Sequence, residues 1–212
     1  MQTIVSLDIG TSVIKCVLFD KKFKQLKIFS EKNIVKYNNL GHSEVSMTKL
    51  WSICKILLIE TIKYSKKNNY NILCIGLTAN MVGLYPIDPN GNPVRNGILW
   101  NDSRTSELMN KMKSENIRIY EEIFSISGSV MQLGCTIPLA KWYYEYEKPL
   151  FKKTKWILNC KDWIRYKLTN TISNDFTEIV VSPGDAKKIN RSKISIISSV
   201  CKFLSVNGTN PS

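Results

Sequence analysis

The feature that most constrains this 212-residue chain is a short polar turn between two apolar, β-rich runs near its start. The turn reads Asp-Ile-Gly-Thr-Ser over residues 8–12, and the runs cover residues 3–8 and 13–19. Two such runs around a glycine-containing turn predict a β-hairpin. The turn is longer and richer in hydroxyl groups than a two-residue hairpin needs, which favours a tip that faces a phosphate. An ordinary hairpin with a surface aspartate is the alternative.

Each polar residue of this turn has a chemical reason to lie near a phosphate. Gly10 lets the backbone turn sharply and approach a ligand closely. Thr11 and Ser12 offer hydroxyl groups and backbone N–H groups, and successive N–H groups in a turn form an anion-binding concavity. Asp8, at the end of the first strand, is placed to hold Mg²⁺ through water, because Mg²⁺ keeps several waters and uses few carboxylates. Lys15 adds a positive charge nearby.

Composition bounds the class of protein. With 43% hydrophobic residues the chain can bury a substantial core. No run of 18 apolar residues predicts a membrane span, and the first residues lead into a strand rather than a secretory signal. The six cysteines form no C-x-x-C pair and the chain has a single histidine, which disfavours a zinc site. We therefore expect reduced cysteines in a cytoplasmic protein.

The net charge of +13 raises the question of nucleic-acid binding. The lysines, however, occur as separate pairs at the ends of predicted elements rather than on one helix or loop. This distribution disfavours nucleic acid as the partner.

The hydrophobic pattern predicts an α/β protein with strands first and a helical stretch inserted later. Strands are expected at residues 3–8, 13–19 and 25–31, followed by one long helix over residues 46–66 and a buried strand over residues 71–78. Further strands are expected at 83–87, 94–100 and 156–158, and helices at 103–112, 117–124, 137–146, 161–170 and 194–204.

A second informative block follows the predicted strand at residues 71–78. There the chain changes abruptly to polar residues, which places Thr78, Asn80 and Met81 at a sheet edge, where ligands commonly bind. Walker A, G-x-G-x-x-G and G-x-S-x-G sequences are absent, which disfavours P-loop, Rossmann and serine-hydrolase chemistry.

A third block reads Trp-Asn-Asp-Ser-Arg over residues 100–104, directly after an apolar run. Trp100 can stack on a sugar ring, and Asp102 and Arg104 can hydrogen-bond hydroxyl groups. The alternative is structural: Asp102 caps the next helix and Arg104 forms a salt bridge.

Together these blocks resemble the FGGY carbohydrate kinases, the group of xylulokinase, glycerol kinase and gluconate kinase. The resemblance runs in order from about residue 3 to residue 178. It rests on residues 8–15, 78–84, 90–105, 127–129, 134–142, 159–169 and 174–177.

The resemblance implies an actin/hexokinase-like (ribonuclease H-like) domain with a central mixed sheet and an inserted helical region. It implies an ATP-dependent phosphotransferase with an alcohol group as acceptor, with ATP and Mg²⁺ as cofactors and a pentulose or polyol as substrate. Asp8 would be the metal-associated residue, and Gly10, Thr11, Ser12 and Lys15 would lie near the transferred phosphoryl group.

The family's substrate-contacting segment corresponds to Asn80, Met81 and Val82, which follow Thr78 in this chain. The third block would lie near the same pocket through Trp100, Asp102 and Arg104. The histidine that follows methionine in xylulokinase-type sites is Val82 here, so the resemblance leaves the identity of the sugar open.

The resemblance also implies that parts of the kinase lie outside this chain. We expect a kinase domain over residues 1–178, a divergent or truncated tail over residues 179–212, and no second kinase domain. The family's catalytic base and adenine-binding glycines belong to that second domain. A separate C-terminal kinase domain or self-association would then complete the enzyme. The alternative is a non-catalytic module that binds a sugar or phosphate or docks a partner.

Overall fold

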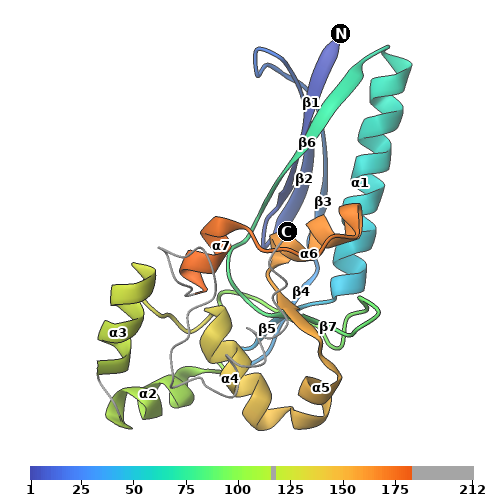
Figure 1. Ribbon diagram of the computed structural model, residues 1–212. Helices are drawn as coiled ribbons and strands as arrows, with labels where there is room; N and C mark the ends of the chain where they lie inside the picture. Colours follow the sequence, from blue (N-terminus) through green and yellow to red (C-terminus); the bar gives the residue numbers. More distant parts are fainter. Residues whose placement is uncertain (116–117, 183–212) are drawn as a thin grey trace. The chain divides into compact units, whose positions relative to one another are not determined.

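The computed structural model describes residues 1–115 and 118–182 (Figure 1). The described part of the chain forms two compact units. Unit 1 comprises Met1–Val35 and Ser46–Asn80, and unit 2 comprises Lys36–Val45 and the described residues from Met81 onward. The predicted helix over residues 194–204 lies outside the described residues. No helix among the described residues has the length and apolarity needed to cross a bilayer.

Unit 1 is built on a four-stranded mixed sheet of order β3-β2-β1-β6. The pair β1–β2 and the pair β2–β3 are antiparallel, whereas β1 and β6 are parallel. The first three strands were expected from the sequence and are confirmed. The strand bounds are β1 Gln2–Ile9, β2 Val13–Asp20, β3 Gln25–Lys32 and β6 Asn71–Ala79.

The long helix α1 (Met47–Lys67) confirms the predicted helix and packs against β2 and β3 (Figure 1). Ser46 caps its N-terminus, because the Ser46 side chain accepts a hydrogen bond from the Lys49 N–H. The Thr61 hydroxyl is fully buried and donates to the Cys16 sulfur of β2 at 3.0 Å. The buried face of α1 follows helical spacing and comprises Met47, Leu50, Cys54, Leu57, Leu58, Thr61 and Ser65.

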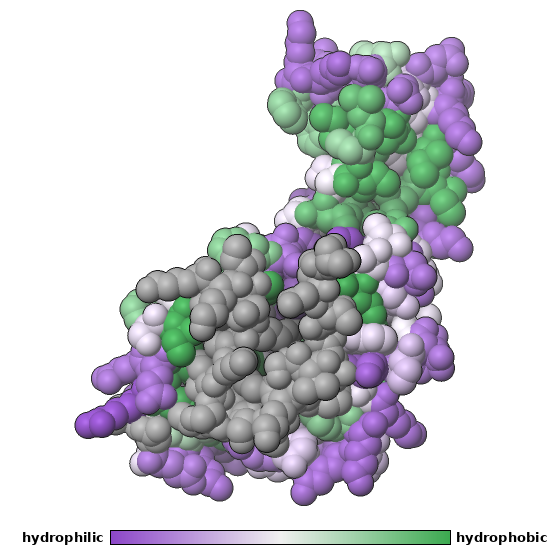
Figure 2. All heavy atoms as spheres, viewed as in Figure 1, coloured by the Kyte–Doolittle hydropathy of each residue, from purple (hydrophilic) through white to green (hydrophobic). Residues whose placement is uncertain are grey.

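Strand β6 corrects one prediction. The sequence predicts a buried strand here, yet none of its residues is buried by the described part of the chain, and Leu73 and Ile75 are 48% and 40% exposed. The reason is its position at the edge of the sheet, where only β1 pairs with it among the described residues. Figure 2 shows hydrophobic residues gathered on the visible face of unit 1.

Unit 2 contains two small sheets. One has the order β4-β5-β8 and the other pairs β7 with β9. The predicted strand over residues 94–100 is reduced to two residues in β8. The strand bounds are β4 Val35–Tyr37, β5 Ser43–Val45, β7 Tyr85–Ile87, β8 Gly97–Ile98 and β9 Trp156–Leu158.

The helices of unit 2 cover these sheets with an apolar core that includes Leu84, Ile98, Leu139 and Tyr143. Four of the helices match predicted ones within a few residues, whereas α5 and α7 were not predicted. The bounds are α2 Ser106–Glu115, α3 Arg118–Ser127, α4 Thr136–Tyr146, α5 Lys148–Lys153, α6 Cys160–Thr169 and α7 Phe176–Val181.

Candidate functional site

The turn between β1 and β2 is held by hydrogen bonds to its backbone. The Gly10 N–H donates to the Val13 carbonyl at 3.1 Å, and the Asn33 N–H donates to the Ser12 carbonyl at 2.9 Å. The Asn33 side chain also donates to the Gly10 carbonyl at 3.0 Å. Asn33 is therefore an anchor of the turn that sequence reasoning missed, since it lies 23 residues from Gly10.

Gly10 is required by space. A Cβ atom at this position would lie 2.6 Å from the Val13 carbonyl oxygen, which is closer than real contacts allow. The tight turn leaves Ser12 exposed at the tip and Thr11 half-buried. This geometry fits the predicted phosphate-facing tip.

Strand register brings three predicted site residues together on one face of the sheet. Asp8 lies opposite Lys15 on β2 and opposite Thr78 on β6. Residues that are directly opposite on neighbouring strands point to the same face, so the three side chains form a row across the sheet. Lys15 and Thr78 are exposed and Asp8 is half-buried. We call these three residues the Asp8 row.

The Asp8 carboxylate forms no ion pair with Lys15 within 4 Å, and none with any other described residue. The described residues also contain no group of three or more His, Cys, Asp or Glu side chains that could hold a metal ion by themselves. A single carboxylate suits Mg²⁺, which is bound through one or two carboxylates together with waters and substrate phosphates. The donor set therefore fits Mg²⁺ held with a phosphate ligand.

Asn80 connects the end of β6 to β1. Its backbone N–H and its side-chain amide both donate to the Ile9 carbonyl, at 2.9 Å and 3.1 Å. Part of its hydrogen-bonding capacity is thus used to hold the end of β6 in place beside the Asp8 row.

The segment Met81–Gly83 begins unit 2 with an unusual backbone. Val82 and Gly83 both have left-handed conformations, with φ of 53° and 80°. Glycine adopts this region readily, whereas a β-branched residue such as valine is a genuine outlier there. Met81 is 45% exposed, so its side chain is accessible to a ligand.

Hydrogen bonds from more distant parts of unit 2 hold this segment. The Val82 N–H donates to Glu178 Oε2 at 3.0 Å, and the Gly83 N–H donates to the Gly134 carbonyl at 3.0 Å. The Thr136 hydroxyl donates to the Gly83 carbonyl at 2.9 Å. Sequence reasoning missed Glu178 and Thr136 because they are far from Val82 along the chain.

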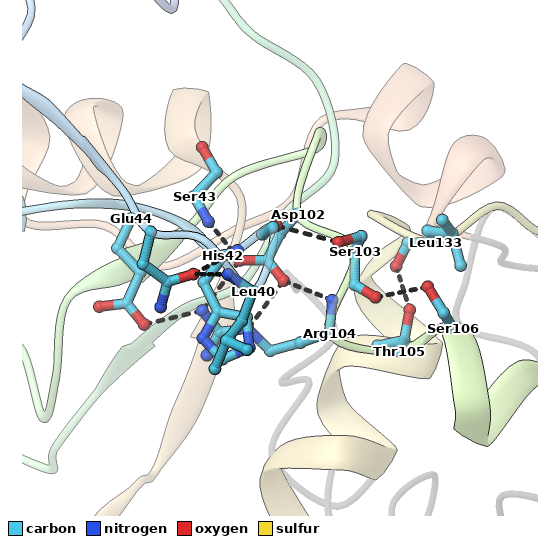
Figure 3. A network of polar contacts seen from close by, with 12 residues as sticks. Leu40, His42, Ser43, Glu44, Asp102, Ser103, Arg104, Thr105, Ser106 and Leu133 are labelled. Carbon is cyan, nitrogen blue, oxygen red and sulfur yellow. Dashed lines mark hydrogen bonds and ion pairs between the residues drawn. The ribbon is translucent and has the colours of Figure 1, made fainter.

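Asp102 and Arg104 lie in a buried charge network (Figure 3). Asp102 is 0% exposed and accepts from the Ser43 N–H at 2.6 Å and from the Arg104 N–H at 2.9 Å. The Arg104 side chain is 2% exposed, bonds Asp102, and donates to Glu44 at 2.8 Å. The Arg104 guanidinium also lies over the Trp142 ring, 4.7 Å from its centroid.

The charges of this network affect one another. Burial raises the pKa of the Glu44 carboxyl, but the hydrogen bond from Arg104 and the charge of Arg95 outweigh burial and lower the pKa overall. Burial lowers the pKa of Arg104, while Asp102 and Glu44 raise it by more. Glu44 and Arg104 are therefore both charged at neutral pH. The geometry therefore matches the structural alternative for Arg104, and it gives Asp102 and Arg104 a role in shaping the strand ends around them.

Trp100 precedes this network and is 51% exposed. Its backbone passes directly against Gly134, where a Cβ atom would lie 1.6 Å from the Trp100 carbonyl oxygen. Gly134 thus packs against the Trp100 backbone. Its carbonyl also accepts the hydrogen bond from the Gly83 N–H, so it contacts the Met81–Gly83 segment as well. Both predicted sugar-contacting blocks of unit 2 meet at this one glycine.

The predicted site residues are divided between the two units. Unit 1 holds Asp8, Gly10, Thr11, Ser12, Lys15, Thr78 and Asn80, and unit 2 holds Met81, Val82, Trp100, Asp102 and Arg104.

Comparison with known proteins identifies the family. The profile of the FGGY family of carbohydrate kinases, N-terminal domain, matches residues 3–183. The chain therefore belongs to the FGGY family of carbohydrate kinases. It is 30% identical to the xylulose kinase of Staphylococcus xylosus over 189 residues, which are 88% of this chain and 36% of that protein. The chain thus spans about a third of the length of such curated relatives.

Solved structures confirm the predicted actin/hexokinase-like fold. The ligand-bound xylulose kinase of Lactobacillus acidophilus matches with a TM-score of 0.88 at 17% identity, over 99% of this chain and 42% of that one. The gluconate kinase of the same organism matches with a TM-score of 0.86 at 17% identity, over 99% and 41%.

Proposed function

We propose that this chain is the phosphate- and sugar-binding N-terminal part of an ATP-dependent kinase that phosphorylates a hydroxyl group of a pentulose or polyol. The observation that carries the proposal is the Asp8 row beside the glycine turn. It puts a carboxylate, an ammonium group and a hydroxyl group on one sheet face. The family membership and the xylulose kinase relatives support the same reaction class.

Phosphoryl transfer requires mainly positioning and neutralisation of phosphate charge. The N–H groups and hydroxyls of Thr11 and Ser12 would bind the phosphate, and the Lys15 ammonium would offset its charge. Asp8 would hold Mg²⁺ through water, and the ion would supply further neutralisation. Asn33 and Gly10 keep the tip in the required shape.

The sugar would contact the exposed Met81 side chain, Val82 and the half-exposed Trp100. Trp100 offers an apolar ring face for the carbon skeleton. Asp102 and Arg104 would act on this region indirectly, because both side chains are buried in their own network.

The partner would be a polypeptide that carries the C-terminal kinase domain, or a second copy of this chain. The exposed Leu73 and Ile75 of β6 support docking on unit 1, since exposed apolar patches mark interaction surfaces. They also favour a second candidate function, a module that binds a sugar and docks a partner without catalysis.

The described cysteines are thiols, which supports a reducing compartment such as the cytoplasm.

The test measures ADP release by the purified chain with ATP, Mg²⁺ and a panel of pentuloses and polyols. The C-terminal domain of the Staphylococcus xylosus xylulose kinase is added in a second arm. Asp8→Asn should abolish sugar-dependent turnover, while Glu31→Gln, an exposed carboxylate change in the same sheet, should not. Sugar binding without turnover in either arm would favour the non-catalytic module. The absence of both sugar binding and turnover would overturn the proposal.

A further inference from the structure

The backbone of Val82 is held in a conformation that the residue itself disfavours. Its φ of 53° lies in the left-handed region, which crowds the branched Cβ of valine. Such residues persist only where the surrounding structure determines them, and they gather at ligand sites. The contacts around Val82 therefore show what imposes this conformation.

Among the residues that the structure describes, one hydrogen bond that holds the segment reaches Val82 itself. Gly134 and Thr136 bind the N–H and carbonyl of Gly83, whereas Glu178 accepts from the Val82 N–H at 3.0 Å across 96 residues. Glu178 is 0% exposed and lies on the short helix α7. A hydrogen bond to a carboxylate is stronger than one to a neutral acceptor, so this contact is suited to hold a strained peptide.

The position of the Glu178 carboxyl group is energetically unfavourable. Its second oxygen, Oε1, is buried and has no hydrogen-bond partner among the described residues. Burial raises the pKa of Glu178, and the Val82 N–H and the charge of Lys161 only partly offset this, while Asp175 raises it further. Packing alone would be served better by an apolar side chain, because a buried polar atom without a partner is unfavourable.

We propose that Glu178 is a positioning residue for sugar binding, which fixes the Val82 peptide and thereby the orientation of the Met81 and Val82 side chains. This inference rests on the proposed function, in which those side chains contact the sugar. Glu178 touches no ligand in this scheme and acts through Val82.

The first measurement needs no sugar. Amide hydrogen exchange at Val82 is compared between the unmodified chain, Glu178→Ala and Glu178→Gln. The alanine variant should exchange about tenfold faster, because the Val82 N–H loses its acceptor, while the glutamine variant retains a carbonyl oxygen of similar size and should stay protected.

The second measurement is the affinity for D-xylulose by calorimetry, with xylitol as a polyol probe. Glu178→Ala should weaken binding about tenfold, which corresponds to about 1.4 kcal/mol, and Glu178→Gln should retain most of the affinity. The matched control is Asp175→Ala, which removes the N-cap of α7 but leaves the Glu178 contact.

The outcomes separate the two proposals. If the unmodified chain binds neither probe, the proposed sugar site is wrong. If Glu178→Ala leaves the exchange rate of the Val82 amide unchanged, the positioning role is overturned. If Glu178→Ala accelerates Val82 exchange but leaves sugar affinity unchanged, the positioning role alone is overturned. Equal losses in Asp175→Ala and Glu178→Ala would assign the effect to α7 as a whole and likewise overturn it.

Discussion

The Arg104 guanidinium donates to both carboxylate oxygens of Asp102, from Nε to Oδ1 and from Nη2 to Oδ2, at 2.8 Å each. Two parallel bonds of this kind add geometric specificity that a lysine cannot reproduce. The pair lies between β5, through the Ser43 N–H, and the Trp142 ring of α4. It therefore connects separate elements of unit 2.

The first prediction concerns this pair. Arg104→Met should destabilise the protein by about 3 kcal/mol, because it leaves the buried Asp102 carboxylate without its charged partner. Urea unfolding measures the loss. The control is Lys111→Ala, which removes a solvent-exposed ion pair of unit 2 and should cost less than about 0.5 kcal/mol. Equal losses of unfolding free energy in the two variants would show that the buried ion pair contributes no more to stability than the exposed one.

The second prediction concerns the phosphate turn. Gly10→Ala should destabilise unit 1 by about 1–3 kcal/mol and weaken ATP binding, because the new methyl group collides with the Val13 carbonyl. Chemical unfolding and nucleotide titration measure both effects. Gly76→Ala is the matched control in the same sheet, since its Cβ would approach nothing closer than 3.9 Å. A Gly10→Ala variant that binds ATP normally would contradict a phosphate-facing tip.

The hairpin and α1 could be predicted because their signals are local. Alternating apolar residues on both sides of residues 8–12 specify which strand faces meet, and the helical spacing of Leu50, Cys54 and Leu57 specifies the face of α1 that is buried. The pairing of Asp8 with Lys15 follows from this register, whereas Thr78 joins the Asp8 row through the parallel pairing of β6 with β1. The edge position of β6 could not be predicted, because an apolar run such as residues 72–77 is typical of a central strand and does not encode its place in the sheet order.

The candidate site shows the same division. The residue types that bind phosphate and sugar stand in recognisable blocks, so the sequence identifies them. Whether Arg104 faces a ligand or a buried partner depends on burial, which no local pattern states. Glu178 could not be found at all, because its contact to Val82 spans 96 residues and its neighbours in sequence carry no related signal.

The third prediction concerns pH. Burial raises the pKa of the Glu178 carboxyl above its ordinary value of 4.5, so the folded chain binds this proton more tightly than the unfolded chain. The stability that Glu178 contributes is therefore fully present below pH 4.5 and is lost as the pH rises through the raised pKa. Glu178→Gln should remove this loss.

Thermal unfolding between pH 4 and pH 8 measures the effect as the change of Tm with pH. Glu122→Gln, an exposed change on α3, should leave the profile of the unmodified chain intact. Glu44 acts in the opposite sense, because its pKa is lowered and its contribution is lost as the pH falls. Identical pH profiles for Glu178→Gln and the unmodified chain would show that Glu178 carries no raised pKa.

The fourth prediction concerns the strain at Val82. Val82→Gly removes the crowding of a branched Cβ at positive φ, which costs about 1–2 kcal/mol, but adds about 0.5–1 kcal/mol of unfolded-chain entropy. The two terms leave a net gain of about 0 to 1.5 kcal/mol in the free energy of unfolding. Urea unfolding measures this gain. The control is Val130→Gly, the same substitution at an exposed residue that does not have a positive φ. At Val130 the entropy term alone remains, so the free energy of unfolding should fall. Equal losses at the two positions would mean that Val82 is not strained, and that Glu178 has no unfavourable conformation to hold.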